Sequence, residues 1–440
     1  ARSKAFSVLE QGVRKGCLIV EDDAGEHQFG KTGDLTVFVN VKNDNLWTRL
    51  LLSYHIGFAE AYMHGDFEVS DLRDLLNLWL DNRTTLTGLS SYISELCQAW
   101  SSLAIYTLGR QNLEKSIENV DGYNVSNDFM QCFLSKEMMY SCAMWSDEEG
   151  GPDGDLIAGP SPGDLEAAQL RKIRHILRLA LAKPGKRLLE IGTGWGAMAI
   201  EAARLGCQVD SVTLSVEQKA LAEERIKAAG LEGQVRVHLC DYRQLPPEFK
   251  NSFDSFVSCE MIEAVGLRQY KDYFGMIDWA LKRNNAAAVI TATSQPEDRY
   301  TDYQPDDFAR HYHWPNTYLP SATSLVTSVQ SVVPGKLVFR RLEDHGIHYP
   351  RTLREWGRRL RSNFKGDFVL GMQERYPMFK DPQLLDAFVK KWLYMFVYAE
   401  VGYARAYTSL SCWTLARPVR PFLYCPEPRS YSLQETVLDV

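Results

Sequence analysis

The stretch LLEIGTGWGAMAI at residues 188–200 constrains the fold of this chain more than any other segment. An apolar run ends at Glu190, a turn carries Gly192, Gly194 and Gly196, and apolar residues then recur at helical spacing. Such a strand, glycine turn and helix lets the backbone and the free N–H groups of the helix approach a ligand closely. The glycine spacing also fits a dinucleotide site. A carboxylate at residue 190, however, would repel a phosphate and attract a cationic amino acid end, which favours S-adenosylmethionine over NAD.

The chain after this turn alternates strands with helices. Strands are expected at 207–214, 234–239, 253–258 and 286–292, and helices at 216–229 and 267–282. This alternation predicts an α/β fold with a doubly wound, mostly parallel sheet of the Rossmann-like methyltransferase type. Ligands of such sheets bind at the carboxyl ends of the strands, so we expect a single pocket at that edge.

Candidate cofactor-binding residues lie at these strand ends. Glu190 is expected to meet the methionine amine, and Tyr123 and Tyr140 to cover the sulfonium, because cations favour aromatic faces. Asp210 falls in the middle of a strand and is expected to be a solvent or edge residue. The other residues expected at the cofactor are Ser141, Gly192, Gly194, Gly196, Thr213, Leu214, Ser215, Gln218, Asp241 and Tyr242.

Length and composition bound the remaining possibilities. A chain of 440 residues exceeds one ordinary core, so two domains are expected. The net charge of −7 argues against nucleic acid as a partner and restricts any membrane contact to a local patch. Nine scattered cysteines without a C-x-x-C pair indicate free thiols and a cytoplasmic location. Neither the cysteines nor the histidines have metal-ligand spacing, so no metal site is predicted.

The flanking segments predict a smaller α+β domain over residues 1–115 and a catalytic domain over 116–440. In the first domain we expect antiparallel strands within 17–41 around a Gly30–Lys31 turn, followed by helices at 46–63, 71–80 and 90–108. The acidic, Gly- and Pro-rich stretch 146–163 predicts a mobile loop, either a lid or a plain surface insertion. Further helices are expected at 353–363 and 383–407, the second dense in aromatic residues.

Several motifs, in a consistent order, carry a resemblance to a known family. The chain resembles the cyclopropane-fatty-acyl-phospholipid synthases from about residue 17 to 418. The segment SCEMIEAVG at 258–266 resembles the branch found in plants, fungi and some bacteria. The other matching segments are GFAEAYMHGDFE at 57–68, YNVSNDF at 123–129, YSCAMW at 140–145, TLSVEQ at 213–218, DYR at 241–243, YLPS at 318–321 and GIHYPRTLREW at 346–356.

The resemblance implies a reaction and its residues. A methyl group passes from S-adenosylmethionine to a cis double bond in an unsaturated phospholipid acyl chain, and loss of one proton closes a cyclopropane. The resemblance further implies bound bicarbonate as the base. It also implies a lipid-presenting N-terminal domain, peripheral membrane contact and a possible homodimer. The residues that it places around the base are Cys142, Glu263, Thr291, Thr293 and Tyr349.

These residues leave alternatives open. The family commonly has His or Gln followed by Ile where this chain has Thr291 and Thr293, and a shifted base could give a methyl-branched or methylene product. Cys142, Glu263 and Tyr349 also have plain structural interpretations, as a small buried side chain, a helix-terminal carboxylate and a packing ring. A related N-methyltransferase branch usually carries Glu-His where this chain has Glu263–Ala264, which counts against methylation of an amine. A catalytically idle lipid-binding homologue is the rival from outside the enzymes.

Overall fold

A seven-stranded sheet with the order β10-β11-β9-β8-β5-β6-β7 organises the larger domain. The structure is a computed structural model and describes residues 1–33, 35–86 and 127–418. The five strands β5 to β9 run parallel, and β10 and β11 are antiparallel to their neighbours. The strands are β5 (Arg187–Ile191), β6 (Gln208–Thr213), β7 (Val235–Leu239), β8 (Ser255–Cys259), β9 (Ala287–Ser294), β10 (Val338–Asp344) and β11 (Ser409–Ala416). This confirms the predicted α/β class.

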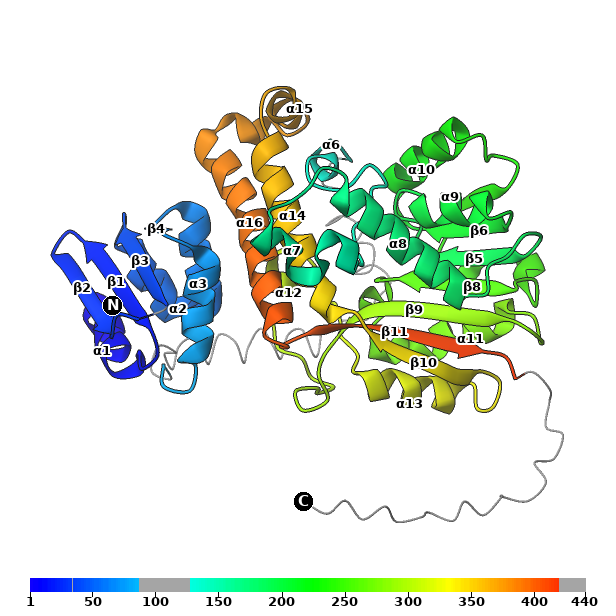
Figure 1. Cartoon of the computed structure of the whole chain (residues 1–440), viewed down its shortest axis with the longest axis horizontal. Coiled ribbons are helices and arrows are strands. Elements are labelled where there is room, and N and C mark those ends of the chain that lie inside the picture. Colours follow the sequence, from blue (N-terminus) through cyan, green and yellow to red (C-terminus); the bar gives the residue numbers. More distant parts are fainter. Residues whose placement is uncertain (34, 87–126, 419–440) are drawn as a thin grey trace, which may run out of the picture.

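Helices cover both faces of the sheet (Figure 1). One face carries α8 (Asp164–Leu179), α9 (Ala197–Arg204) and α10 (Val216–Ala228), and the other carries α11 (Tyr270–Ala280) and α13 (Ala322–Val332). Residues 188–191 of β5 are therefore all buried, as expected for a parallel strand between two helical layers. Strand β9 continues beyond its predicted end at residue 292, so Thr293 lies within the strand together with Thr291.

The N-terminal domain contains a second sheet with the order β2-β1-β3-β4. Its strands are β1 (Cys17–Asp22), β2 (Gly25–Gly30), β3 (Thr36–Val41) and β4 (Phe67–Val69), and its helices are α1 (Arg2–Gly12), α2 (Asn45–His64) and α3 (Leu72–Asp81). The expected antiparallel pairing is confirmed for β1 and β2, but the expected turn at residues 30 and 31 was wrong. The tight turn connects β1 to β2 at residues 23 and 24, and β3 returns parallel to β1.

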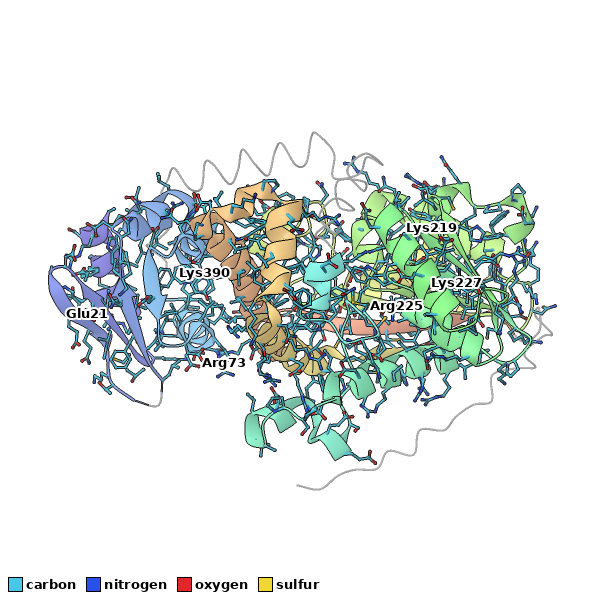
Figure 2. The ribbon with its side chains drawn as sticks, turned by 90° about the horizontal axis from the view of Figure 1, so that it is seen from above. Glu21, Arg73, Lys219, Arg225, Lys227 and Lys390 are labelled. Atoms are coloured by element: carbon cyan, nitrogen blue, oxygen red, sulfur yellow. The ribbon has the colours of Figure 1, made fainter. Side chains whose placement is uncertain are left out.

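A helical layer lies between the two sheets (Figure 1). It contains α14 (Tyr349–Asn363), α15 (Asp367–Arg375) and α16 (Pro382–Ala404), and the first and last of these match the predicted helices. Helix α16 packs against α2 and α3, and the ring centroids of Tyr394 and Tyr62 lie 5.7 Å apart. Arg73, labelled in Figure 2, pairs with Glu400 across this contact at 3.7 Å. The predicted helix 90–108 and the boundary near residue 115 lie outside the described residues.

The first part of the stretch 146–163, which was expected to be a mobile loop, is anchored by buried contacts. It forms two 3₁₀ turns, Asp147–Glu149 and Gly151–Asp153, and the short helix α7 (Gly154–Ile157). The Asp155 side chain is fully buried and accepts hydrogen bonds from Arg354 at 2.7 Å and Arg358 at 2.8 Å. Charge pairing at buried positions thus overrides the Gly- and Pro-rich composition. This segment lines neither cavity described below.

Two further short α-helices are α6 (Asn127–Gln131) and α12 (Phe308–Tyr312). Within residues 1–33, 35–86 and 127–418, none of the helices combines the length and apolar character needed to span a bilayer.

Candidate functional site

A pocket opens at the carboxyl ends of β5, β6, β7 and β8, the edge predicted from the strand alternation. Its wall includes most of the residues expected at the cofactor and one of those expected at the base. The predicted residues that line it are Tyr140, Ser141, Glu190, Gly192, Gly194, Thr213, Leu214, Ser215, Gln218, Asp241, Tyr242 and Glu263. The predicted Tyr123 lies outside the described residues.

Glu190 lies at the end of β5 and is buried. Its carboxylate accepts a hydrogen bond from Ser211 Oγ at 2.5 Å, and Ser211 Oγ in turn lies 2.6 Å from Thr193 Oγ1. Burial raises the pKa of Glu190 to about 8, although Ser211 and the nearby cation of Lys172 oppose the shift. A carboxyl group in this state gains a strong partner when a cationic group enters the pocket. The position therefore suits the amino acid end of S-adenosylmethionine.

The three glycines have different roles. Gly194 (φ 51°) has open space where a Cβ would stand, so its backbone is available to a ligand. At Gly192 (φ 95°), a Cβ would lie 3.3 Å from Met261. Gly196 (φ 86°) does not line the pocket, contrary to the prediction. A Cβ there would lie 3.2 Å from Ala222 Cβ, so this glycine allows α9 to pack closely against α10.

Polar side chains after β6 and β7 are held by local hydrogen bonds. Ser215 Oγ caps α10 by accepting the N–H of Gln218 at 3.2 Å, and Thr213 Oγ1 donates to Gln218 Oε1 at 3.0 Å. Asp241 accepts hydrogen bonds from the Arg243 guanidinium at 2.9 and 3.0 Å. These contacts orient a part of the pocket wall that is expected to meet the cofactor.

Asp210 is a correction to the sequence analysis. It is buried, not exposed, and pairs with Arg187 at 2.8 Å and with His238 at 2.9 Å. These hydrogen bonds and charges lower its pKa against the opposing effect of burial. Asp210 therefore ties β6 to β5 and β7 and stabilises the sheet.

An aromatic cluster adjoins the pocket on the side of α14 and α16. Tyr140 lines the pocket and stacks on Trp356 of α14, with ring centroids 5.2 Å apart. Trp314 lines the same pocket, 6.3 Å from Tyr140 between centroids. The Trp392 ring of α16 lies 6.4 Å from Tyr140. The cofactor pocket thus continues directly into an apolar aromatic wall.

Sequence reasoning missed the most telling residue, Glu260, which follows β8 directly and also lines the pocket. Its Oε1 accepts the backbone N–H of Cys142 at 2.9 Å, and its Oε2 accepts the hydroxyl of Tyr349 at 2.6 Å. Its φ of 48° lies in the left-handed region, a strained conformation for a residue with a side chain. The available signal was a second carboxylate three positions before Glu263, at a strand end that faces the pocket.

Glu263 lines the same pocket and is bonded to strand β9. Its Oε1 accepts the backbone N–H of Thr293 at 2.7 Å, and its Oε2 is buried with no hydrogen-bond partner among the described residues. Burial, with the neighbouring charge of Glu260, raises the pKa of Glu263 to about 8. Thr293 Oγ1 lies 2.8 Å from the hydroxyl of Tyr403. Glu263 is thus bound to β9 while one of its oxygens stays unpaired.

Cys142 and Thr291 both support Glu260. Thr291 Oγ1 accepts the backbone N–H of Glu260 at 3.2 Å, and its carbonyl accepts the same N–H at 2.9 Å. Burial raises the pKa of the Cys142 thiol well above its ordinary value, so this cysteine contributes through its backbone N–H. A small second cavity lies beyond Glu260 and is also lined by Cys142, Thr291, His175 and His345.

The two histidines of this cavity contact one carboxylate. Glu343 lies 2.6 Å from His175 Nε2 and 3.3 Å from His345 Nε2. The three groups are close enough to hold a metal ion, which the sequence spacing did not indicate. The ion pairs of His175 and His345 with Glu343 also explain this arrangement without a metal ion.

The residues can be tested against the two groups that the sequence analysis implied. S-Adenosylmethionine fits, because the buried Glu190 carboxyl and the open backbone at Gly194 lie in one pocket. Bicarbonate does not fit. Its expected donors, the N–H of Cys142 and the hydroxyl of Tyr349, are taken by Glu260, and the N–H of Thr293 by Glu263. A further anion would also face the Glu260 carboxylate in a poorly solvated site.

Comparisons with known proteins identify the family of this chain. The family model described as mycolic acid cyclopropane synthetase matches residues 111–381. Tuberculostearic acid methyltransferase UfaA1 of Mycobacterium tuberculosis is 32% identical over 378 residues, which cover 83% of this chain and 80% of that protein. Cyclopropane-fatty-acyl-phospholipid synthase of Escherichia coli is 30% identical over 327 residues, covering 74% and 76%.

Two solved structures share the fold. The cyclopropane synthase MmaA2 of Mycobacterium tuberculosis superposes with a TM-score of 0.53 at 22% identity, covering 68% of this chain and 98% of that one. Coclaurine N-methyltransferase superposes with a TM-score of 0.59 at 17% identity, covering 82% and 99%. At these identities the similarity establishes the fold alone.

Proposed function

The chain belongs to the mycolic acid cyclopropane synthetase family of S-adenosylmethionine-dependent methyltransferases, and from this premise we propose that it methylates a cis double bond in a lipid acyl chain and closes a cyclopropane. The observation that carries the proposal is one pocket lined by both Glu190 and Glu260. A group suited to the cofactor amine and a carboxylate suited to accepting a proton therefore face the same space. The aromatic wall around Tyr140 and Trp356 supports an apolar acceptor.

S-Adenosylmethionine, when bound, supplies an electrophilic methyl group on a positively charged sulfur. The protein must hold the weakly nucleophilic double bond in line with that methyl group. The rings of Tyr140 and Trp314 provide an apolar surface for an acyl chain and a favourable face for positive charge. They also keep water away from the carbocation that forms on the acyl chain, because water would trap it as an alcohol.

Proton loss then determines the product. In our proposal a carboxylate beside the pocket removes a proton from the added methyl group, and the freed electron pair closes the three-membered ring. If a hydride first moves to the cationic carbon, loss of a methyl proton gives a methylene-branched chain instead.

This branched product is the second candidate, because the 32% identical relative is named as a tuberculostearic acid methyltransferase. Thr291 and Thr293 replace the family's usual pair, which is His or Gln followed by Ile. The two threonines are consistent with either product. Methylation of a small amine remains a further alternative.

One experiment tests the reaction. Purified protein is incubated with methyl-labelled S-adenosylmethionine and vesicles of a monounsaturated phospholipid, and the lipids are analysed by mass spectrometry and proton NMR. A gain of one CH₂ with upfield ring protons supports cyclopropane formation. Vinylidene signals would establish the methylene-branched product. A parallel reaction contains a small amine in addition to the vesicles. Label that is found only in this amine, and not in the lipids, would refute a lipid acceptor.

Lipid contact is the other part of the proposal. A phospholipid substrate requires peripheral contact with a membrane surface, and the N-terminal domain is proposed to help present the lipid. Sedimentation of the protein with the same vesicles measures this contact, and absence of binding together with activity only on dispersed lipid would contradict it. The homodimer and the cytoplasmic location stay predictions from the sequence.

A further inference from the structure

Three segments that are distant in the sequence converge on the carboxylate of Glu260. Its backbone is fixed by Thr291 of β9, its Oε1 by the N–H of Cys142, and its Oε2 by Tyr349 at the start of α14. The two partners of the carboxylate lie 118 and 89 residues away along the chain. Strained positive-φ residues of this kind persist where surrounding contacts hold them, and such positions cluster at functional sites.

The carboxylate also has the surroundings of a base. It borders the cofactor pocket on one side and the small cavity with His175 and His345 on the other. Burial and the low local dielectric raise the pKa of Glu260, while the nearby charge of Lys172 and the hydrogen bonds from Tyr349 and Cys142 oppose the shift. A general base works best when its pKa is shifted toward the working pH.

We propose that the Glu260 carboxylate is itself the base of this reaction and replaces an external anion at the site. The inference rests on the proposed function. The π electrons of the double bond form the new carbon–carbon bond to the methyl group, and the carbon–sulfur bond breaks with its electron pair remaining on sulfur. A C–H bond of the added methyl then breaks, its electron pair closes the ring onto the cationic carbon, and the proton goes to Glu260.

Glu263 does not fill this role. Its Oε1 is held by the backbone of Thr293, and within the described part of the chain the hydrogen bonds of Tyr349 and Cys142 go to Glu260 instead. Two adjacent carboxylates in a buried site also cannot both carry a full charge at low cost. We therefore assign the charged, proton-accepting state to Glu260, the carboxylate that has two donors and lies near Lys172.

The first test is bicarbonate dependence in the full chain. In buffer freed of carbon dioxide, the wild type should keep its activity to within about twofold, because the base is built in. Glu260→Gly removes the carboxylate, suits the positive φ and opens space beside Cys142 and Tyr349. It should lose at least about 100-fold in turnover, the usual scale for a missing general base, and regain part of it when bicarbonate is added. A wild type that needs bicarbonate would overturn the proposal, as would a Glu260→Gly variant that is fully active without it.

A binding measurement gives a readout that does not depend on lipid turnover. Carbon-13 NMR with labelled bicarbonate should detect binding to Glu260→Gly but not to the wild type, and bicarbonate bound by the wild type would overturn the proposal. Glu260→Gln serves as the matched control, since it fills the same space without a base and should be neither active nor rescued. S-Adenosylhomocysteine binding checks that both variants are folded. If the wild type methylates no lipid, the proposed function fails, whereas the bicarbonate result still decides what occupies the site.

Discussion

Binding of S-adenosylhomocysteine should release a proton from Glu190. The unliganded carboxyl has a pKa of about 8, so roughly nine-tenths of the molecules are protonated at pH 7. A ligand ammonium favours the ionised form, and the proton must then leave. The affinity for S-adenosylhomocysteine should therefore rise with pH, because a larger fraction of Glu190 is already ionised. The expected rise is about 50-fold from pH 6 to pH 8, or about 2.3 kcal/mol. We use S-adenosylhomocysteine because its uncharged sulfur limits the effect to the amino acid end.

Titration calorimetry in two buffers of different ionisation enthalpy measures the released proton. Glu190→Gln should abolish the release, flatten the pH dependence and weaken binding at pH 8 by about 10- to 100-fold, the scale of one charge-assisted hydrogen bond. Glu263→Gln is the matched control, because its carboxyl has a similar pKa and lines the same pocket. It should keep the proton release. Flat affinity between pH 6 and 8 in the wild type would refute the reasoning, and loss of the release in the control alone would assign it to Glu263.

Three further predictions concern stability, each measured by denaturant or thermal unfolding. Gly196→Ala should destabilise more than Gly194→Ala, by about 1–3 kcal/mol, because both have positive φ but only the first would crowd Ala222; equal losses would contradict this packing role. Asp155→Asn should cost about 1.5–3 kcal/mol, because it removes a fully buried charge that accepts hydrogen bonds from Arg354 and Arg358, whereas exposed Asp153→Asn should change stability by less than about 0.5 kcal/mol. The stability of the unliganded wild type relative to that of Glu263→Gln should fall as pH rises from 5 to 8, because native Glu263 keeps a proton that the unfolded chain has lost.

Local patterns in the sequence were enough to predict the fold class and one end of the cofactor site. The glycine turn after Glu190 and the alternation of strands with helices depend on residues within a few positions of one another. Such short-range features determine local conformation, and parallel topology then brings strand ends to one edge. The predicted pocket wall, from Glu190 to Asp241, followed from that rule alone.

The tertiary structure decided which side chains meet. Glu260 and Glu263 stand three residues apart in one motif, and the sequence offers no reason to prefer either as the partner of Tyr349. Only the backbone conformation at Glu260, combined with a helix that begins at Tyr349, makes the choice. In the same way Asp155 is ordered by arginines about 200 residues away. Contacts over such separations depend on the packing of whole elements, which local sequence patterns do not encode.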